Sequence, residues 1–264
     1  MPFASVNGQR LFYEDSGGTG PAVIFSHGLF MDHEMFAPQV EALSDRYRCI
    51  TWDERGHGQT AGDTLEPFSY YDSADDLAAL LAHLGIERAV LAGMSQGGFL
   101  SMRCALTHAD KVRALILIDT QAGVEDPTKM AGYEQLLHDW TTNGLSEEVA
   151  NIIEGIILGE NWPGATYWKA KWRAMSAGNV AGCFATLSAR DDITPRISAI
   201  KVPTLVVHGA ADAAIPLALA EVLVERIAGA QLAVIPGAGH AANLTHPAAT
   251  NAALAEFLNR LGDA

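Results

Sequence analysis

Residues 93–98, with the sequence GMSQGG, place a serine in a pattern that can make it a nucleophile. Ser95 follows a short apolar run at residues 89–92 and precedes a helical pattern, which predicts a turn between a strand and a helix. A serine on such a turn has strained backbone angles, and side chains at the flanking positions would collide with neighbouring backbone. Gly93 and Gly97 remove those side chains. The segment therefore predicts an exposed serine hydroxyl at the carboxyl edge of a sheet.

A serine nucleophile needs a base to take its proton, and the base needs a carboxylate to orient it. His240 follows an apolar run at residues 231–235, and Asp212 follows another at residues 204–208. Both therefore fall at the same predicted sheet edge as Ser95. We expect Ser95 to be the nucleophile, His240 the general base and Asp212 the orienting acid.

Other residues compete for two of these roles. Asp119 also follows an apolar run, so it is the alternative acid, although we favour Asp212. Among the other histidines, His208 lies inside an apolar run and is expected in the core. His27 is expected to brace its loop by hydrogen bonding, and His57 lies in a turn flanked by glycines. None of these three is expected to be the base.

Two backbone amides can complete such a site. The apolar run at residues 22–26 is followed by His27, Gly28 and Leu29. The N–H of Leu29 can point into the site beside the N–H of Gln96, which follows the serine. Two donors in these positions would receive the negative charge that develops on the acyl oxygen. We expect Leu29 and Gln96 to form an oxyanion hole.

The elements that must position these residues are short strands alternating with helices. Near the N-terminus, residues 3–6 and 11–14 alternate on either side of Asn7-Gly8, which predicts a hairpin. Later runs are apolar at nearly every position, which suits strands buried on both faces. They cover residues 22–26, 48–52, 89–92, 113–118, 204–208 and 231–235. The pattern predicts the α/β class, with a mostly parallel twisted sheet of about eight strands and helices on both faces.

The strand–helix alternation is interrupted once, between Ile118 and Pro203, where only helical patterns occur. A structureless loop of this length would be unusual inside a compact domain. We therefore predict a helical cap at residues 120–199, inserted into a core formed by residues 1–119 and 200–264. The cap segment holds four of the five tryptophans, which either pack within it or line a substrate pocket.

The amino-acid composition limits the classes of molecule that the protein is expected to bind. Lys and Arg number 17 against 31 Asp and Glu, so the formal net charge is −14. Such a surface repels phosphate backbones and anionic lipid. No secretory signal or membrane-length apolar stretch is visible, and the three cysteines fit neither a disulfide framework nor a zinc site. We expect a cytoplasmic protein that binds no metal, nucleic acid or membrane.

Taken together, the motifs resemble those of the α/β-hydrolase fold family over nearly the whole chain. The resemblance implies a nucleophile, acid and base at Ser95, Asp212 and His240, with oxyanion donors at Leu29 and Gln96, and no cofactor or metal. The matching segments are residues 27–28 (HG), 53–58 (DERGHG), 93–98 (GMSQGG), 202–204 (VPT) followed by Gly209 and Asp212, and 239–240 (GH).

Within this family the chain resembles small esterases, enol-lactonases and cofactor-free haloperoxidases. Serine at position 95 argues against the haloalkane dehalogenase and epoxide hydrolase branches, which use aspartate there. The expected substrate is a small, largely apolar carboxylic ester or lactone, cleaved through an acyl-enzyme. The alternatives are hydrolysis of a carbon–carbon bond or perhydrolysis on the same triad, or a ligand-binding protein that resembles a receptor.

Overall fold

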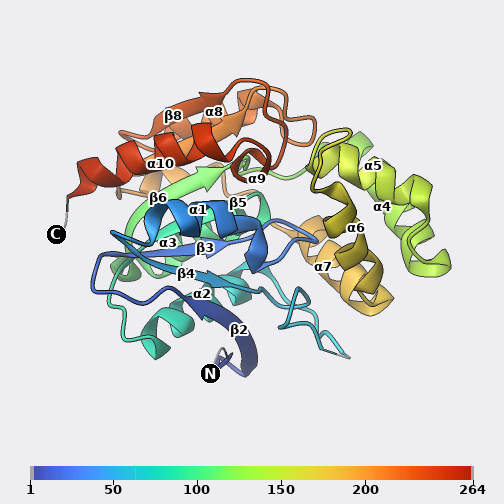
Figure 1. The fold of residues 1–264 in the computed structure, drawn as a ribbon, viewed down its shortest axis with the longest axis horizontal. Helices are drawn as coiled ribbons and strands as arrows, with labels where there is room; N and C mark the ends of the chain where they lie inside the picture. The colour runs from blue at the N-terminus through green and yellow to red at the C-terminus, as the bar shows by residue number, and fades with distance from the viewer. Residues whose placement is uncertain (1–2, 63, 263–264) are drawn as a thin grey trace.

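One twisted sheet of eight strands runs through the protein, whose computed structural model describes residues 3–62 and 64–262 (Figure 1). The strand order is β1-β2-β4-β3-β5-β6-β7-β8. Strands β1 and β2 form the predicted hairpin, and β2 also pairs antiparallel with β4; the remaining pairs are parallel. The strands are β1 (Phe3–Val6), β2 (Gln9–Asp15), β3 (Ala22–Ser26), β4 (Arg48–Trp52), β5 (Ala89–Met94), β6 (Val112–Ile118), β7 (Thr204–Gly209) and β8 (Gln231–Ile235).

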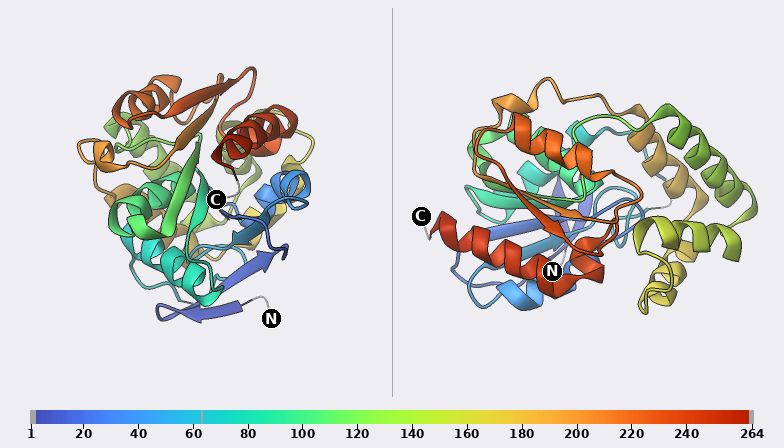
Figure 2. Two further views of the ribbon diagram at one scale, coloured as in Figure 1. Left: turned by 90° about the vertical axis from the view of Figure 1, so that its left-hand side faces the viewer. Right: turned by 90° about the horizontal axis from the view of Figure 1, so that it is seen from above.

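Helices cover both faces of this sheet, which confirms the predicted fold class (Figure 2). Helices α1 and α10 pack on one face, and α2, α3 and α8 pack on the other. Their bounds are α1 (Ala37–Leu43), α2 (Tyr70–His83), α3 (Gln96–Thr107), α8 (Leu217–Arg226), α9 (Ala242–Thr245) and α10 (Pro247–Leu261), with short 3-10 turns at His33–Phe36, Ala109–Lys111 and Ile197–Ala199. Within residues 3–62 and 64–262, no helix is long and apolar enough to cross a membrane.

Strand β5 shows why the central strands are apolar at every position. Val90 and Ala92 pack in the cluster beneath α1 and α10, whereas Leu91 packs in the cluster beneath α2, α3 and α8. Successive side chains of a strand point to opposite faces, so both sets meet a helical layer. Because neither face is open to water, the alternation of polar and apolar residues disappears.

Between β6 and β7 the chain forms four helices that lie together beyond one end of the sheet (Figures 1 and 2). These cap helices are α4 (Pro127–Asn143), α5 (Glu147–Ile157), α6 (Ala165–Ala174) and α7 (Ala177–Ala189). Most of their buried apolar side chains belong to the same cluster as one face of the sheet, whereas Leu187 of α7 belongs to the cluster on the other face. The indole N–H of Trp172 donates to the carbonyl of Phe30 at 3.0 Å, which ties α6 to the loop after β3.

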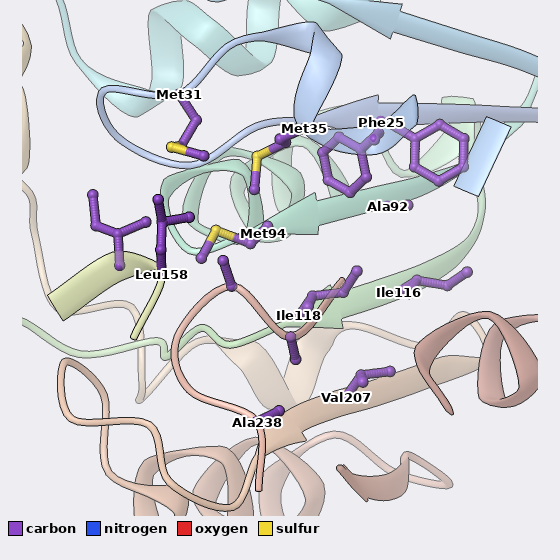
Figure 3. Packing of buried hydrophobic residues seen from close by; sticks show 14 of the residues in the cluster. Phe25, Met31, Met35, Ala92, Met94, Ile116, Ile118, Leu158, Val207 and Ala238 are labelled. Atoms are coloured by element: carbon purple, nitrogen blue, oxygen red, sulfur yellow. The ribbon is translucent and has the colours of Figure 1, made fainter. Parts of the chain in front are cut away.

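Three methionines fill the space between that loop and the end of β5. Met31, Met35 and Met94 lie close together there, with Leu158 nearby at the end of α5 (Figure 3). A Cβ at Gly28 would lie 2.5 Å from the sulfur of Met94, so a larger residue there would require the Met94 side chain to move. The packing brings the loop after β3 against the end of β5.

Candidate active site

Ser95 occupies the tight turn between β5 and α3. Its backbone has φ +51° and ψ −113°, and its N–H donates to the Ile118 carbonyl at 2.9 Å. A Cβ at Gly93 would lie 2.1 Å from the Gly97 carbonyl oxygen, and a Cβ at Gly97 would lie 2.0 Å from that of Ser26. Backbone atoms cannot move aside cheaply, so both glycines are sterically required for this turn, as the sequence predicts.

A chain of hydrogen bonds connects the three predicted triad residues. The Nε2 atom of His240 lies 3.1 Å from Ser95 Oγ, and Nδ1 lies 2.9 Å from Asp212 Oδ2. The other carboxylate oxygen of Asp212 accepts the N–H groups of Ala214 and Ile215, each at 2.9 Å. Asp212 is therefore held by its own loop while it contacts the imidazole.

The two charged groups of this chain shift each other's protonation. Burial raises the pKa of Asp212, but the His240 ring opposes this, and the net pKa is below the ordinary value. Burial lowers the pKa of His240, but the Asp212 carboxylate outweighs it, and the net pKa is above the ordinary value. Asp212 is thus ionised at neutral pH and favours a protonated His240.

Asp119, the alternative acid, makes different contacts. It is fully buried after β6, and its two oxygens accept the N–H groups of Gly209 at 2.7 Å and Ala242 at 2.9 Å. These bonds tie the end of β6 to β7 and to the start of α9. Burial raises the pKa of Asp119 to about 8. Asp212 therefore contacts the His240 ring, whereas the two oxygens of Asp119 accept backbone N–H groups.

The two predicted oxyanion donors lie beside Ser95. Gln96 is the first residue of α3, so its N–H has no acceptor within the helix. Leu29 lines the same pocket as Ser95 and His240. A Cβ at the preceding Gly28 would lie 3.7 Å from Ser95 Cβ, which shows how closely this loop approaches the serine.

The pocket above Ser95 is enclosed by the cap and is mostly apolar. Its cavity volume is about 100 Å³. Apolar walls come from α4, α5 and α7, through residues such as Leu136, Ile153 and Phe184. The four tryptophans of residues 120–199 are not among its lining residues in the part of the chain that the structure describes. Of the two roles considered for them, the structure therefore favours packing.

A family model of the alpha/beta hydrolase fold matches residues 21–247 of the chain. The chain belongs to the α/β-hydrolase fold family. The matched region runs from β3 through β8 and includes the cap helices. The resemblance seen in the motifs is thereby confirmed.

Members of this family resemble the chain over nearly its whole length. A non-heme haloperoxidase of Rhodococcus erythropolis is 30% identical, over 98% of this chain and 99% of that protein. The structure of the enol-lactonase from Burkholderia xenovorans has a TM-score of 0.89 at 28% identity, and covers 98% of this chain and 100% of its own. A thermophilic esterase from Thermogutta terrifontis has a TM-score of 0.87 at 28% identity, over 96% of this chain and 94% of its own.

In this α/β hydrolase, buried polar side chains form hydrogen bonds with the side chain of Gln96. The side-chain amide of Gln96 donates to Glu54 at 2.5 Å and accepts the hydroxyl of Tyr70 at 3.3 Å. Burial raises the pKa of Glu54 to about 8. Glu54 lies in the DERGHG segment noted in the sequence, but no sequence signal related it or Tyr70 to Gln96, because these contacts form only when α2, α3 and the loop after β4 pack together.

The other histidines of this α/β hydrolase brace the loops around the site. His27 accepts the backbone N–H of Glu54 at 2.9 Å, as expected of a bracing residue, and His57 accepts that of Phe30 at 3.2 Å. Burial lowers the pKa of both rings, that of His57 to about 3. His208, buried at the end of β7, donates to the Ile215 carbonyl at 2.8 Å.

Proposed function

We propose that the protein is a serine hydrolase that cleaves a small, largely apolar carboxylic ester or lactone. The observation that carries this proposal is the hydrogen-bonded chain from Ser95 through His240 to Asp212, which opens into an apolar pocket. An esterase and an enol-lactonase are among the proteins similar to this chain, which supports the same substrate class.

The first half of the reaction forms an acyl-enzyme. His240 takes the hydroxyl proton as Ser95 Oγ attacks the acyl carbon, and Asp212 stabilises the resulting imidazolium. The amides of Leu29 and Gln96 receive the oxyanion, an effect of about 3–4 kcal/mol per donor in comparable sites. His240 then gives its proton to the departing alcohol, and the carbonyl re-forms on Ser95.

The second half releases the acid. His240 removes a proton from a water molecule, which attacks the acyl carbon, and the oxyanion forms again between the same two amides. Collapse of this intermediate returns the proton to Ser95 and frees the carboxylic acid. The apolar walls of the pocket bind the carbon chain of the substrate through burial of apolar surface.

A second activity on the same acyl-enzyme is favoured by the similarity to a non-heme haloperoxidase. If hydrogen peroxide replaces water as the attacking group, the product is a peracid. The proton again passes to His240, and no group beyond the triad is needed. Release of peracid from acetate and peroxide, measured by halide oxidation, would establish this activity.

A panel of p-nitrophenyl esters from acetate to octanoate tests the main proposal. We expect multiple turnovers that depend on Ser95, with a preference for chains that fill the apolar pocket. The measurement is kcat/KM for each ester by release of p-nitrophenol. If no ester or simple lactone turns over while a fluorophosphonate still labels Ser95, the substrate belongs to another class.

The rate should fall at acidic pH, because His240 must be neutral to accept a proton. Activity is present above the pKa of His240 and is lost as the pH falls through it. Since Asp212 raises this pKa above the ordinary value of 6.5, we expect the midpoint of the fall in kcat/KM to lie above that value. A profile that stays flat down to about pH 4 would contradict a histidine base.

A further inference from the structure

Two polar side chains interrupt the apolar wall of the pocket away from the triad. The lining is otherwise apolar apart from backbone, Ser95 and His240, and the two additions are Glu125 and Tyr133. Glu125 precedes α4, and Tyr133 lies in the first half of that helix. The proposed ester cleavage uses neither of them, so their place in the pocket calls for another role.

One carboxylate oxygen of Glu125 accepts hydrogen bonds from the protein, and the other is available to a ligand. Its side chain is 9% exposed, and Oε1 accepts from Arg190 at 3.0 Å and from Gln121 at 2.9 Å. Across residues 3–62 and 64–262, no hydrogen bond is formed to Oε2. This oxygen is also not sealed off from solvent, so it is available as an acceptor in the pocket.

Arg190 supplies the balancing charge but cannot reach a substrate. Its side chain is 2% exposed, and besides Glu125 it donates to the carbonyls of Gly123 at 3.2 Å and Leu187 at 2.9 Å. The guanidinium also lies 4.4 Å from the centre of the Phe99 ring. It is not among the residues that line the pocket. A substrate carboxylate in the pocket would therefore contact the Glu125 carboxylate and not the Arg190 guanidinium.

Tyr133 adds a second polar group on the same side. Burial and the nearby Glu125 carboxylate raise the pKa of Tyr133, so its hydroxyl stays protonated at neutral pH. Within the described part of the chain, this hydroxyl forms no hydrogen bond with another residue. It can therefore donate to a ligand oxygen, or accept from it, while Glu125 accepts.

We propose that Glu125 and Tyr133 recognise a hydroxyl group carried by the apolar body of the substrate, and that Glu125 rejects substrates bearing a carboxylate. The proposal rests on the proposed ester or lactone cleavage. A hydroxyl matches this pair because it donates to Oε2 and exchanges a second hydrogen bond with Tyr133. A buried ammonium fits less well, because Arg190 already neutralises Glu125 and the apolar walls would leave the new charge without a counterion.

Two matched substrate series test the recognition of a hydroxyl. On the acyl side these are p-nitrophenyl esters of heptanoic, 6-hydroxyhexanoic and adipic acid, the last with one free carboxylate. On the alcohol side they are pentyl, 4-hydroxybutyl and 3-carboxypropyl hexanoate, followed by acid release. In at least one series, we expect kcat/KM for the hydroxyl substrate to exceed that of the alkyl substrate by about tenfold or more. The carboxylate substrate should be the poorest of each series.

The variant Glu125→Gln should weaken this order. Its amide can still accept from Arg190 and Gln121, but it presents a donor to the pocket and leaves the charge of Arg190 without a partner. The ratio of hydroxyl to alkyl substrate should fall, because the neutral amide forms a weaker hydrogen bond with the hydroxyl than the carboxylate does. The relative kcat/KM of the carboxylate substrate should rise about tenfold. Tyr133→Phe should lower the hydroxyl ratio alone. Glu134→Gln, which removes the same charge from an exposed neighbour on α4, should keep the wild-type ratios.

The outcomes separate this inference from the proposed function. Equal rates for hydroxyl and alkyl substrates in both series, or unchanged ratios in Glu125→Gln, would overturn the recognition of a hydroxyl while ester cleavage stands. Failure to hydrolyse even the alkyl esters would overturn the proposed function, and the inference with it. Ratios of kcat/KM are the readout because a general loosening of the cap would lower all rates together.

Discussion

Replacement of Ser95 by alanine should lower kcat on the best ester by about 10⁶-fold. The reason is that no other group can form the acyl-enzyme at this position: His240 Nε2 is 3.1 Å from the Ser95 hydroxyl and would be left facing a methyl group. The measurement is kcat with saturating ester, together with labelling by a fluorophosphonate, which the variant should no longer show.

Loss of folding must be separated from loss of chemistry in this variant. Alanine keeps the Cβ that the turn already accommodates, so we expect the free energy of unfolding to change by no more than about 1 kcal/mol. The exposed Ser198 offers a matched control, and Ser198→Ala should retain full activity. Residual activity of a few per cent in purified Ser95→Ala would rule out Ser95 as the nucleophile.

The second large effect is expected in Asp212→Asn, with kcat lowered about 10⁴-fold. An asparagine amide can face His240 Nδ1 with its N–H₂ group, which favours the wrong tautomer of the ring. It also removes the negative charge that stabilises the imidazolium. The two backbone amides that hold Asp212 can still donate to the asparagine oxygen, so the loop should keep its geometry.

Asp119→Asn is the matched comparison, because it makes the same chemical change at the neighbouring carboxyl group. Both oxygens of Asp119 accept backbone N–H groups, so an asparagine amide would leave one of these donors unpaired. We expect a loss of about 1–3 kcal/mol in the free energy of unfolding and a much smaller effect on kcat. Near-full activity in Asp212→Asn together with a collapse in Asp119→Asn would reverse the assignment of the acid.

Local patterns in the sequence predicted most of the strands and helices of the fold. Apolar runs located six of the eight strands within two residues of their ends. Five of these strands are buried on both faces, as such runs predict, whereas the edge strand β8 is exposed or half-buried at every position except Ile235. The largest difference is at β5, which continues through Gly93 to Met94 because Gly93 pairs with Ser26 on one side and Leu117 on the other. From the neighbouring sequence alone, a glycine within a hydrogen-bonded strand cannot be distinguished from a glycine that begins a turn.

The turn at Ser95 was also predictable from the sequence, because glycines flank the serine at positions 93 and 97. A Cβ at Gly93 would clash with the Gly97 carbonyl inside the turn itself, whereas a Cβ at Gly97 would clash with the carbonyl of Ser26 on the neighbouring strand β3. The short motif therefore predicts the turn, but the packing of β3 against it is what excludes a side chain at position 97.

Sequence patterns therefore predicted the succession of strands and helices, the turn at Ser95, and the sheet edge at which the candidate residues lie. The tertiary structure adds the contacts: Asp212 faces the His240 ring, whereas Asp119, which also follows a strand, accepts backbone N–H groups. The same holds for Glu125 in the pocket and for Glu54 behind Gln96. The periodicity of apolar residues along the chain shows which residues are buried, but it does not show which of them meet. Ser95 and His240 are 145 positions apart, and their contact depends on how whole helices and strands pack.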